Sequence, residues 1–238
     1  MGQISTLSFF KYTTFAQKVW AFKMMQFAHQ PMSRVKGLSF YKLMGSGKDL
    51  GFNPWPDWST YAILQIWDDK QYAQEYLDGD LFSRYRQHSA EQWVIFLEHV
   101  TSKGTWSGTN PFVSKAELQE DEPLAVITRA TIKWREMWPF WSYVPTAQTG
   151  IAENPSLIFT KGIGEAPFRQ MATFSIWKNQ QALKDFAYKR QEHARAVQLT
   201  KEREWYAEEM FARFRVSDSY GSWPGVELNE LRLEGTKE

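Results

Sequence analysis

The feature that most limits how this chain can fold is an internal repeat. The stretch from Asn154 to Gly225 resembles an earlier part of the sequence, and the first set of matches shares one offset along the chain. The matched positions are Leu38 with Leu157, Phe40 with Phe159, Lys42 with Lys161, Gly45 with Gly164, Ile66-Trp67 with Ile176-Trp177, and 104–108 with 221–225. Because the matches keep the same order, we infer that the chain contains two copies of one unit.

Hydrophobic periodicity gives each copy the order strand, helix, strand, strand, helix, strand. Strands are predicted near 4–10, 38–43, 61–67 and 94–100 in the first copy, and near 128–132, 157–161, 171–177 and 209–216 in the second. A helix is predicted from about Thr14 to Ala28. Phe15, Val19, Phe22 and Met25 or Gln26 recur at helical spacing and form its expected core-facing stripe, with Lys18 and Lys23 off that face. Residues 162–165 are predicted to form a turn.

This order is typical of a ferredoxin-like unit, a four-stranded antiparallel sheet with helices on one face. The predicted fold class is therefore α+β, a tandem duplication of a ferredoxin-like βαββαβ unit. Its two antiparallel sheets would form a dimeric-α/β-barrel-like sandwich within one chain, with a cavity between them. The predicted domains are a first unit at 1–108, a linker at 109–123, a second unit at 124–225 and a loose polar tail at 226–238.

Alternation along the strands predicts which side chains face the cavity. The apolar set Ala172, Phe174 and Ile176 is expected to pack on the helices. The mixed set on the other face is expected to line the cavity; its members are Met171, Thr173, Ser175 and Trp177. Arg129 and Lys161 are charges within apolar strands, and they either point into the space between the sheets or lie at strand ends with their charged groups in water.

Composition excludes several classes of site. The chain of 238 residues has no cysteine, which rules out disulfides, thiolate haem ligation, iron–sulfur clusters and a cysteine nucleophile. A net charge of +1 lacks the excess of lysine and arginine that binding to a nucleic acid backbone requires. The 12 Trp, 17 Phe and 10 Tyr suit either a pocket for a bulky apolar ligand or an aromatic-rich core. With no signal-type leader and no long apolar run, we expect a cytoplasmic protein.

One of the four histidines is a candidate metal ligand. His193 precedes the small residues Ala194 and Ala196, and a single helical imidazole facing a cavity is a common way to hold haem. The alternative is an exposed or structural histidine. A non-haem iron site would need two histidines and a carboxylate, for which His88 and His193 with a glutamate are the candidates. The glycines at 162 and 164 lack the context of a nicotinamide or flavin site.

Taken together, several motifs resemble the spheroidene monooxygenase family, the acyclic carotenoid ketolases of bacteria. The motifs are Gly45-Ser46-Gly47, 128–131, 159–165, 173–177, His193-Ala194 and 212–216. The likeness runs from about Phe9 to Gly225 and is densest in the second copy. The Trp/Pro-rich loop from Asn53 to Trp58 departs from the family pattern, which leaves the particular carotenoid open.

The resemblance implies a haem b protein that uses dioxygen and external electrons, with ferredoxin as the usual donor, to make a ketone near a carotenoid end. His193 would be the axial ligand, and Arg129, Lys161 and Arg195 are candidate partners of the haem propionates. Arg129 and Lys161 are also the predicted catalytic residues. Trp177 would contact both haem and substrate. The other predicted substrate-lining residues are Phe159, Phe168, Met171 and Thr173.

Other readings stay open. The aromatic stretch 138–143 would form a pocket lip in peripheral contact with the inner membrane, or would pack into the core. Haem proteins of the same architecture also dehydrate aldoximes, so a haem-dependent dehydratase or lyase is the alternative enzyme. A non-catalytic module that binds haem or an apolar ligand, and a cofactor-free monooxygenase, are the remaining alternatives.

Overall fold

The structure is a computed structural model that describes residues 2–50, 55–113, 116–147, 154–189, 205–227 and 231. Its strands are β1 (Ile4–Lys11), β2 (Leu38–Gly47), β3 (Pro56–Trp67), β4 (Glu91–Gly104), β5 (Leu124–Ile132), β6 (Leu157–Ala166), β7 (Gln170–Trp177) and β8 (Tyr206–Gly221). Its helices are α1 (Phe15–Phe27), α2 (His29–Met32), α3 (Lys70–Asp78), α4 (Asp80–His88), η1 (Trp134–Glu136), α5 (Met137–Ala147) and α6 (Gln180–Lys189).

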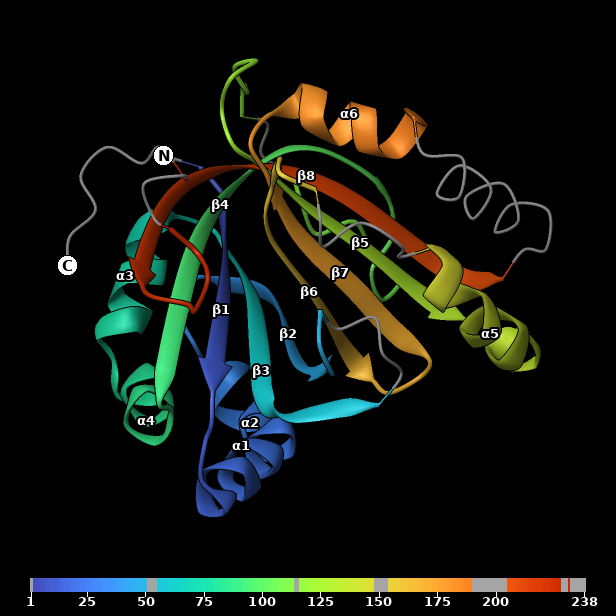
Figure 1. Cartoon of the computed structure of the whole chain (residues 1–238). Helices are drawn as coiled ribbons and strands as arrows, with labels where there is room; N and C mark the ends of the chain where they lie inside the picture. Colours follow the sequence, from blue (N-terminus) through green and yellow to red (C-terminus); the bar gives the residue numbers. More distant parts are fainter. Residues whose placement is uncertain are drawn as a thin grey trace.

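The eight strands close into one barrel in the order β1-β3-β2-β6-β7-β5-β8-β4, with antiparallel pairing throughout (Figure 1). Each half of the chain has the same strand order, β4-β1-β3-β2 and β8-β5-β7-β6, which is that of a ferredoxin-like sheet. The predicted α+β fold with two antiparallel sheets joined in one barrel is confirmed.

The two seams between the halves differ in length. Strands β4 and β8 pair over most of their length, from Trp93 opposite Gly221 to Gly104 opposite Met210. Strands β2 and β6 pair only through Gly45 with Gly164 and Ser46 with Ile163. The barrel is therefore firmly joined along one seam and barely joined along the other.

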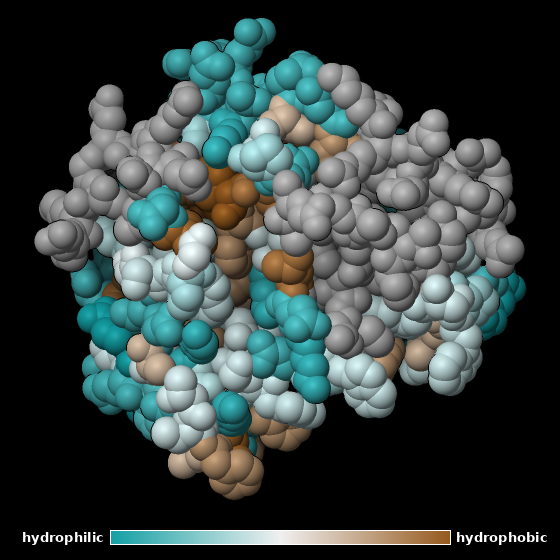
Figure 2. Space-filling model, in the orientation of Figure 1, coloured by the Kyte–Doolittle hydropathy of each residue, from teal (hydrophilic) through white to brown (hydrophobic). Residues whose placement is uncertain are grey.

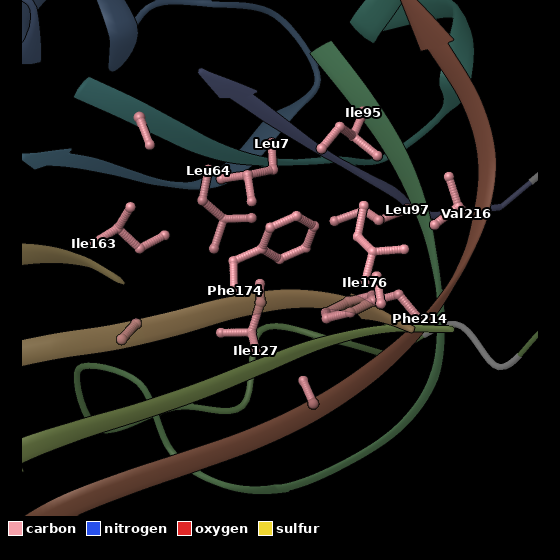
Figure 3. Close-up of a cluster of buried hydrophobic side chains, with 14 of the residues drawn as sticks. Leu7, Leu64, Ile95, Leu97, Ile127, Ile163, Phe174, Ile176, Phe214 and Val216 are labelled. Carbon is pink, nitrogen blue, oxygen red and sulfur yellow. The ribbon is translucent and has the colours of Figure 1, made fainter. Parts of the chain in front are cut away.

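The barrel interior is a packed core. Figure 3 shows apolar side chains from both halves meeting there, among them Leu7, Leu64 and Phe174. The ring of Phe174 lies 5.9 Å from that of Phe9 and 6.1 Å from that of Phe159. The described residues do not form the cavity predicted between the sheets, because apolar side chains from both sheets fill that space.

The predicted alternation is therefore reversed. Ala172, Phe174 and Ile176 point into the barrel, whereas Trp177 packs against Phe186 of α6 on the outer face, with ring centroids 4.9 Å apart. The physical reason is that both faces of the sheet are covered. The inner face meets only the apolar face of the other sheet, so it is the more uniformly apolar of the two, while the layer beneath the helices accepts threonine and serine.

Helix α1 also differs from its predicted orientation. It begins at the Thr14 cap, whose side chain accepts a hydrogen bond from Gln17 N–H. Phe15 and Phe22, expected on the core-facing stripe, are 83% and 57% exposed, and Ala21 is the buried residue of the helix. Because aromatic residues occur on two opposite sides of this helix, Phe15 and Phe22 on one and Trp20 and Phe27 on the other, helical spacing alone could not identify the buried side.

Two smaller predictions need correction. Gly162 to Glu165 belong to β6, and the chain reverses later, where Phe168 adopts a φ of 63°. Phe112, within the predicted linker, packs against Phe214 of β8. Leu231 is 1% exposed in the barrel core, so this described part of the 226–238 segment is not a loose tail.

No helix in the described ranges has both the length and the apolar character needed to cross a bilayer.

Candidate functional site

A pocket of about 230 Å³ lies at the short seam. Four residues form a continuous cross-strand row through it: Tyr61 pairs with Gly45, Gly45 with Gly164, and Gly164 with Met171. The row crosses β3, β2, β6 and β7, so it joins the first half of the chain to the second. Tyr61 packs with the helices of the first half and Met171 with those of the second, which places this pocket on the outer side of the barrel.

Glycine at the centre of the row gives the pocket its depth. A Cβ placed on Gly45 would meet no atom within 4 Å, so the missing side chain leaves open space. Gly164 is glycine for a different reason, because a Cβ there would lie 2.4 Å from the carbonyl oxygen of Gln170. Glycine inside a strand often marks a close approach of another group, and at this seam it leaves room between two helices.

The walls come from helices on either side of the seam. Phe22 and Met25 of α1 line one wall, and Trp141 of α5 lines the other. Trp141 Nε1–H donates a hydrogen bond of 2.8 Å to the carbonyl oxygen of Phe168, which fixes α5 to the β6–β7 turn. Phe168 and Met171, both predicted to contact substrate, therefore lie together in this pocket, beside the aromatic stretch 138–143.

Asp57 lines the pocket beside Tyr61, and Ser46, Glu165 and Gln170 are further polar residues of its lining. Burial alone would raise the pKa of the Asp57 carboxyl, but hydrogen bonds from Ser59 and the nearby Lys161 charge outweigh it and lower the pKa. Burial, with a smaller contribution from Asp57, raises the pKa of Tyr61 to about 12. The pocket thus presents a carboxylate and a neutral phenol at neutral pH.

Lys161 lies on β6, on the same strand face as Phe159 and Ile163. Its side chain extends to the short seam. Its Nζ donates to the carbonyl oxygen of Asp49 at 2.7 Å and lies 3.5 Å from Asp57 Oδ2. Burial lowers the pKa of the Lys161 ammonium, and the Asp57 charge only partly opposes this. The lysine therefore connects β6 to the loop after β2 and places its charge behind the pocket.

Arg129 points into the barrel, and its side chain is 1% exposed. Of its two predicted orientations, the structure has the one toward the space between the sheets. Its guanidinium pairs with Glu208 and lies 3.5 Å from Glu165 Oε1. Glu165 also pairs with Lys42 Nζ at 2.7 Å and accepts a hydrogen bond from Trp106 Nε1–H. This cluster joins the two halves through side chains, and it occupies Arg129 with two carboxylates.

A second candidate surface lies on the outer face of the second sheet. Gly162, Thr173 and Thr128 are successive cross-strand partners there, and they form a strip of small side chains. Trp177 and Phe186 bound the strip on the α6 side, and Met171 packs with Phe140 on the α5 side. Thr128 is exposed and Thr173 is half-buried. A flat ligand can lie on such a strip without displacing a large side chain.

Arg213 lies on the same outer face, one row along the sheet, where it pairs with Val126. Its Nε is buried and has no hydrogen-bond partner in the described part of the chain. The predicted ligand His193 and the neighbouring Arg195 lie outside the described residues. The chain leaves α6 at Lys189 and is described again from Trp205, which packs on Phe140 of α5. Lys189 ends the helix that bounds the strip on one side, and Trp205 packs on the helix that bounds it on the other.

The described histidines make ordinary protein contacts. His88 stacks on Trp20 with ring centroids 4.1 Å apart, His29 contacts Tyr41, and His99 stacks on Phe112. Within the ranges that the structure describes, no three His, Asp or Glu side chains come close enough together to hold a metal ion.

The structure thus distributes the predicted site residues over several places. Phe168 and Met171 line the seam pocket, Thr173 lies on the strip, Trp177 lies beneath α6, and Phe159 is in the barrel core. Sequence reasoning missed Tyr61 and the part that Gly45 has in the pocket floor. The available signal was the Gly45-Ser46-Gly47 motif inside a strand, since a strand-interior glycine often marks a close approach.

The chain is similar to three curated proteins, each named spheroidene monooxygenase. The protein of Rhodobacter capsulatus is 36% identical over 225 residues, which cover 93% of each chain. The protein of Cereibacter sphaeroides is 31% identical over 225 residues, covering 94% of this chain and 69% of the relative. That of Rubrivivax gelatinosus is 26% identical over 211 residues, or 88% of this chain and 81% of the relative. A comparison with protein-family models gave no match.

Two solved structures share the architecture over nearly the whole chain. A crystal structure of aldoxime dehydratase has a TM-score of 0.66 at 11% identity, covering 97% of this chain and 88% of that one. A second aldoxime dehydratase, OxdRE in complex with butyraldoxime, has a TM-score of 0.66 at 8% identity, covering 98% and 86%. At such low identity these likenesses show the fold alone.

Proposed function

The chain belongs to the spheroidene monooxygenase family, and we propose that it introduces a keto group into an acyclic carotenoid as a haem-dependent monooxygenase. Membership makes the protein an oxidoreductase of the monooxygenase class. We further propose that the cofactor is haem b, that dioxygen is the oxidant and that ferredoxin donates the external electrons.

The observation that carries the haem proposal is the strip formed by Gly162, Thr173 and Thr128. It replaces the space between the sheets as the proposed haem position, because the barrel interior is filled by packed side chains. The small side chains leave room for a flat macrocycle, and the described residues before and after the segment that carries His193 respectively belong to α6 and pack on α5, the two helices that bound the strip. Arg213 Nε, buried without a described partner, suits a propionate.

When bound, haem with a single histidine ligand supplies an open iron position at which dioxygen is activated. The chain's own residues have simpler tasks. His193 would hold the iron, and Arg213 would neutralise a propionate. The hydroxyls of Thr128 and Thr173 are the polar groups of the strip. The apolar residues around them, Trp177 and Met171, would exclude water from that surface.

The seam pocket is the proposed site for the carotenoid end. Met171 lines the pocket, and Thr173, two residues further along β7, lies on the strip. Side chains two residues apart in a strand share a face and are separated by roughly 7 Å. An extended apolar chain held between Trp141 and Phe168 can therefore reach from the pocket to the strip without entering the barrel core.

The test is to purify the full chain with haem and to assay it with an acyclic carotenoid, dioxygen and reduced ferredoxin. We expect a keto product that depends on dioxygen and reductant, and a Soret band that is altered in His193→Ala. His88→Ala is the matched control, because His88 is a helical histidine stacked on Trp20. An unchanged Soret band in His193→Ala would reject the ligand. Conversion of an aldoxime without dioxygen or reductant would favour the dehydratase instead.

A further inference from the structure

We propose that the seam pocket opens onto a lipid-docking surface, which we call the aromatic rim and which binds the face of an anionic bilayer. The rim comprises the exposed aromatic residues Phe22, Trp55, Trp58, Trp138 and Phe168. This proposal rests on the proposed function in one respect only. A carotenoid substrate is dissolved in lipid, so an enzyme that acts on it benefits from binding a bilayer. Membrane binding itself can be measured without turnover.

The rim residues are large and unusually accessible. Trp138 is 88% exposed, Trp55 63%, Phe22 57%, Trp58 53% and Phe168 36%. Large apolar side chains gathered at one site on a surface mark an interaction site, whereas single ones need no explanation. In Figure 2 the lower end of the molecule, where Figure 1 places α1, shows brown and tan apolar surface.

Four of these side chains form two ring contacts across segments, and Trp138 lies on the helix that carries a third contact. Phe22 of α1 contacts Trp58 at a centroid distance of 5.6 Å, and Trp55 contacts Phe168 at 6.1 Å. Phe168 also contacts Trp141, which is one turn of α5 beyond Trp138. The rim thus draws on α1, the start of β3, the β6–β7 turn and α5. Phe22, Trp58 and Phe168 are at the same time lining residues of the seam pocket, so the rim surrounds the pocket mouth.

The lysines of α1, together with Lys48, favour an anionic lipid surface. Residues 1–48 contain six lysines and one arginine and no aspartate or glutamate, although the whole chain has a net charge of only +1. The remaining residues therefore carry a net charge of −6. Lys18 and Lys23 lie on α1 beside Phe22, and the backbone of Lys48 is hydrogen-bonded to that of Trp55. Two other lysines of this region, Lys11 and Lys42, pair with glutamates, and the carboxylates of Asp57 and Glu165 line the pocket inside the rim. Basic residues interleaved with Trp and Phe are typical of a surface that lies in the bilayer interface.

The test is sedimentation of the purified full chain with vesicles of phosphatidylcholine alone or mixed with phosphatidylglycerol. We expect stronger binding to the anionic vesicles. The double variant Phe22→Ser/Trp138→Ser should bind roughly tenfold more weakly, because binding scales with buried apolar area. Lys18→Gln and Lys23→Gln should each lower binding to anionic vesicles by about fivefold, with no effect on neutral ones.

Val113→Ser is the matched control. Val113 is 73% exposed, and its N–H donates to Gln3, which lies at the end of β1 opposite to α1. It should bind like the unchanged protein. Absence of binding to either vesicle, or full binding by the double variant, would overturn the proposal. A dimer in solution that Phe22→Ser converts to a monomer would assign the rim to a second copy and also overturn it. Ketolase activity in detergent is measured separately, so a failure of the proposed reaction is not confused with a failure of docking.

Discussion

Gly45 of β2 and Gly164 of β6 are cross-strand partners in the short seam between the two halves of the barrel. Tyr61 and Met171 continue the same row on either side, so two glycines lie between two large side chains. The pocket exists because the strands still pair at this point while the side chains that would fill the groove are missing. A site built this way depends on two positions that are far apart in the sequence.

Filling the groove at Gly45 should block the pocket without unfolding the protein. Gly45 has no positive φ, and a Cβ there meets nothing within 4 Å, so Gly45→Leu can be accommodated. We expect the thermal midpoint of Gly45→Leu to stay within a few degrees of the unchanged protein, while KM for the carotenoid rises at least tenfold. Gly45→Ala, which adds one methyl group, is the size control and should have a small effect. Equal activity of the two variants would show that substrate does not use this pocket.

Removing Arg213 should weaken haem binding. Its Nε is buried without a described partner, so replacement by methionine removes a cation and leaves the rest of β8 intact. We expect faster loss of haem to apomyoglobin from Arg213→Met and an unchanged far-ultraviolet circular dichroism spectrum. Arg215→Met is the control, because Arg215 is two residues along the same strand and already pairs with Glu98. A similar rate of loss in both variants would contradict the role of Arg213.

The Arg129 cluster should be a stability element. Arg129→Met would leave Glu208 and Glu165 without their shared cation, and breaking a buried pair costs about 3 to 5 kcal/mol. Because both glutamates keep some contact with water, we expect the lower end of that range in urea unfolding. Lys11→Met breaks the partly exposed pair with Glu91 and should cost less than about 1 kcal/mol. A loss of activity in Arg129→Met with no loss of stability would favour the predicted catalytic role instead.

The same cluster should make stability depend on acid pH. Burial alone would raise the pKa of Glu208, but hydrogen bonds from Gly108 N–H, Arg129 and Thr105 outweigh it and lower the pKa. A carboxyl whose pKa is lower in the folded state stabilises the fold above its unfolded pKa of about 4.3 and loses this contribution as the pH falls through the folded pKa. We expect the free energy of unfolding of Glu208→Gln to fall less steeply than that of the unchanged protein below about pH 4.3. Identical pH profiles would refute the coupling.

The reversed alternation predicts a large difference between two phenylalanines. Phe174 is fully buried in the barrel, so Phe174→Ala should lower the free energy of unfolding by about 3 to 5 kcal/mol. Phe15 was expected on a core-facing stripe but is 83% exposed, so Phe15→Ala should change it by less than about 0.5 kcal/mol. Urea denaturation of the two variants measures both effects. A large loss in Phe15→Ala would restore the predicted orientation of α1.

The repeat in the sequence was enough to predict the α+β class, the strand order of each half and the joining of two sheets in one chain. Repeated apolar strands separated by helical segments have few ways to bury their faces, which is why this part was predictable. The motifs in the second half were also enough to indicate the family. Of the residues predicted to contact substrate, Phe168 and Met171 line one pocket, whereas Phe159 and Trp177 lie in the barrel core and beneath α6.

Only the tertiary structure decided which face of each strand is inside. Alternation separates two sets of side chains, but Ala172, Phe174 and Ile176 could equally have faced helices or the other sheet, because both environments are apolar. The pocket was hidden for a similar reason. Gly45 and Gly164 make a groove only after β2 and β6 pair across the seam, and that contact joins residues 119 positions apart. The sequence by itself determined the ferredoxin-like pattern of strands and helices, and the way the two sheets close on each other decided where the pocket lies.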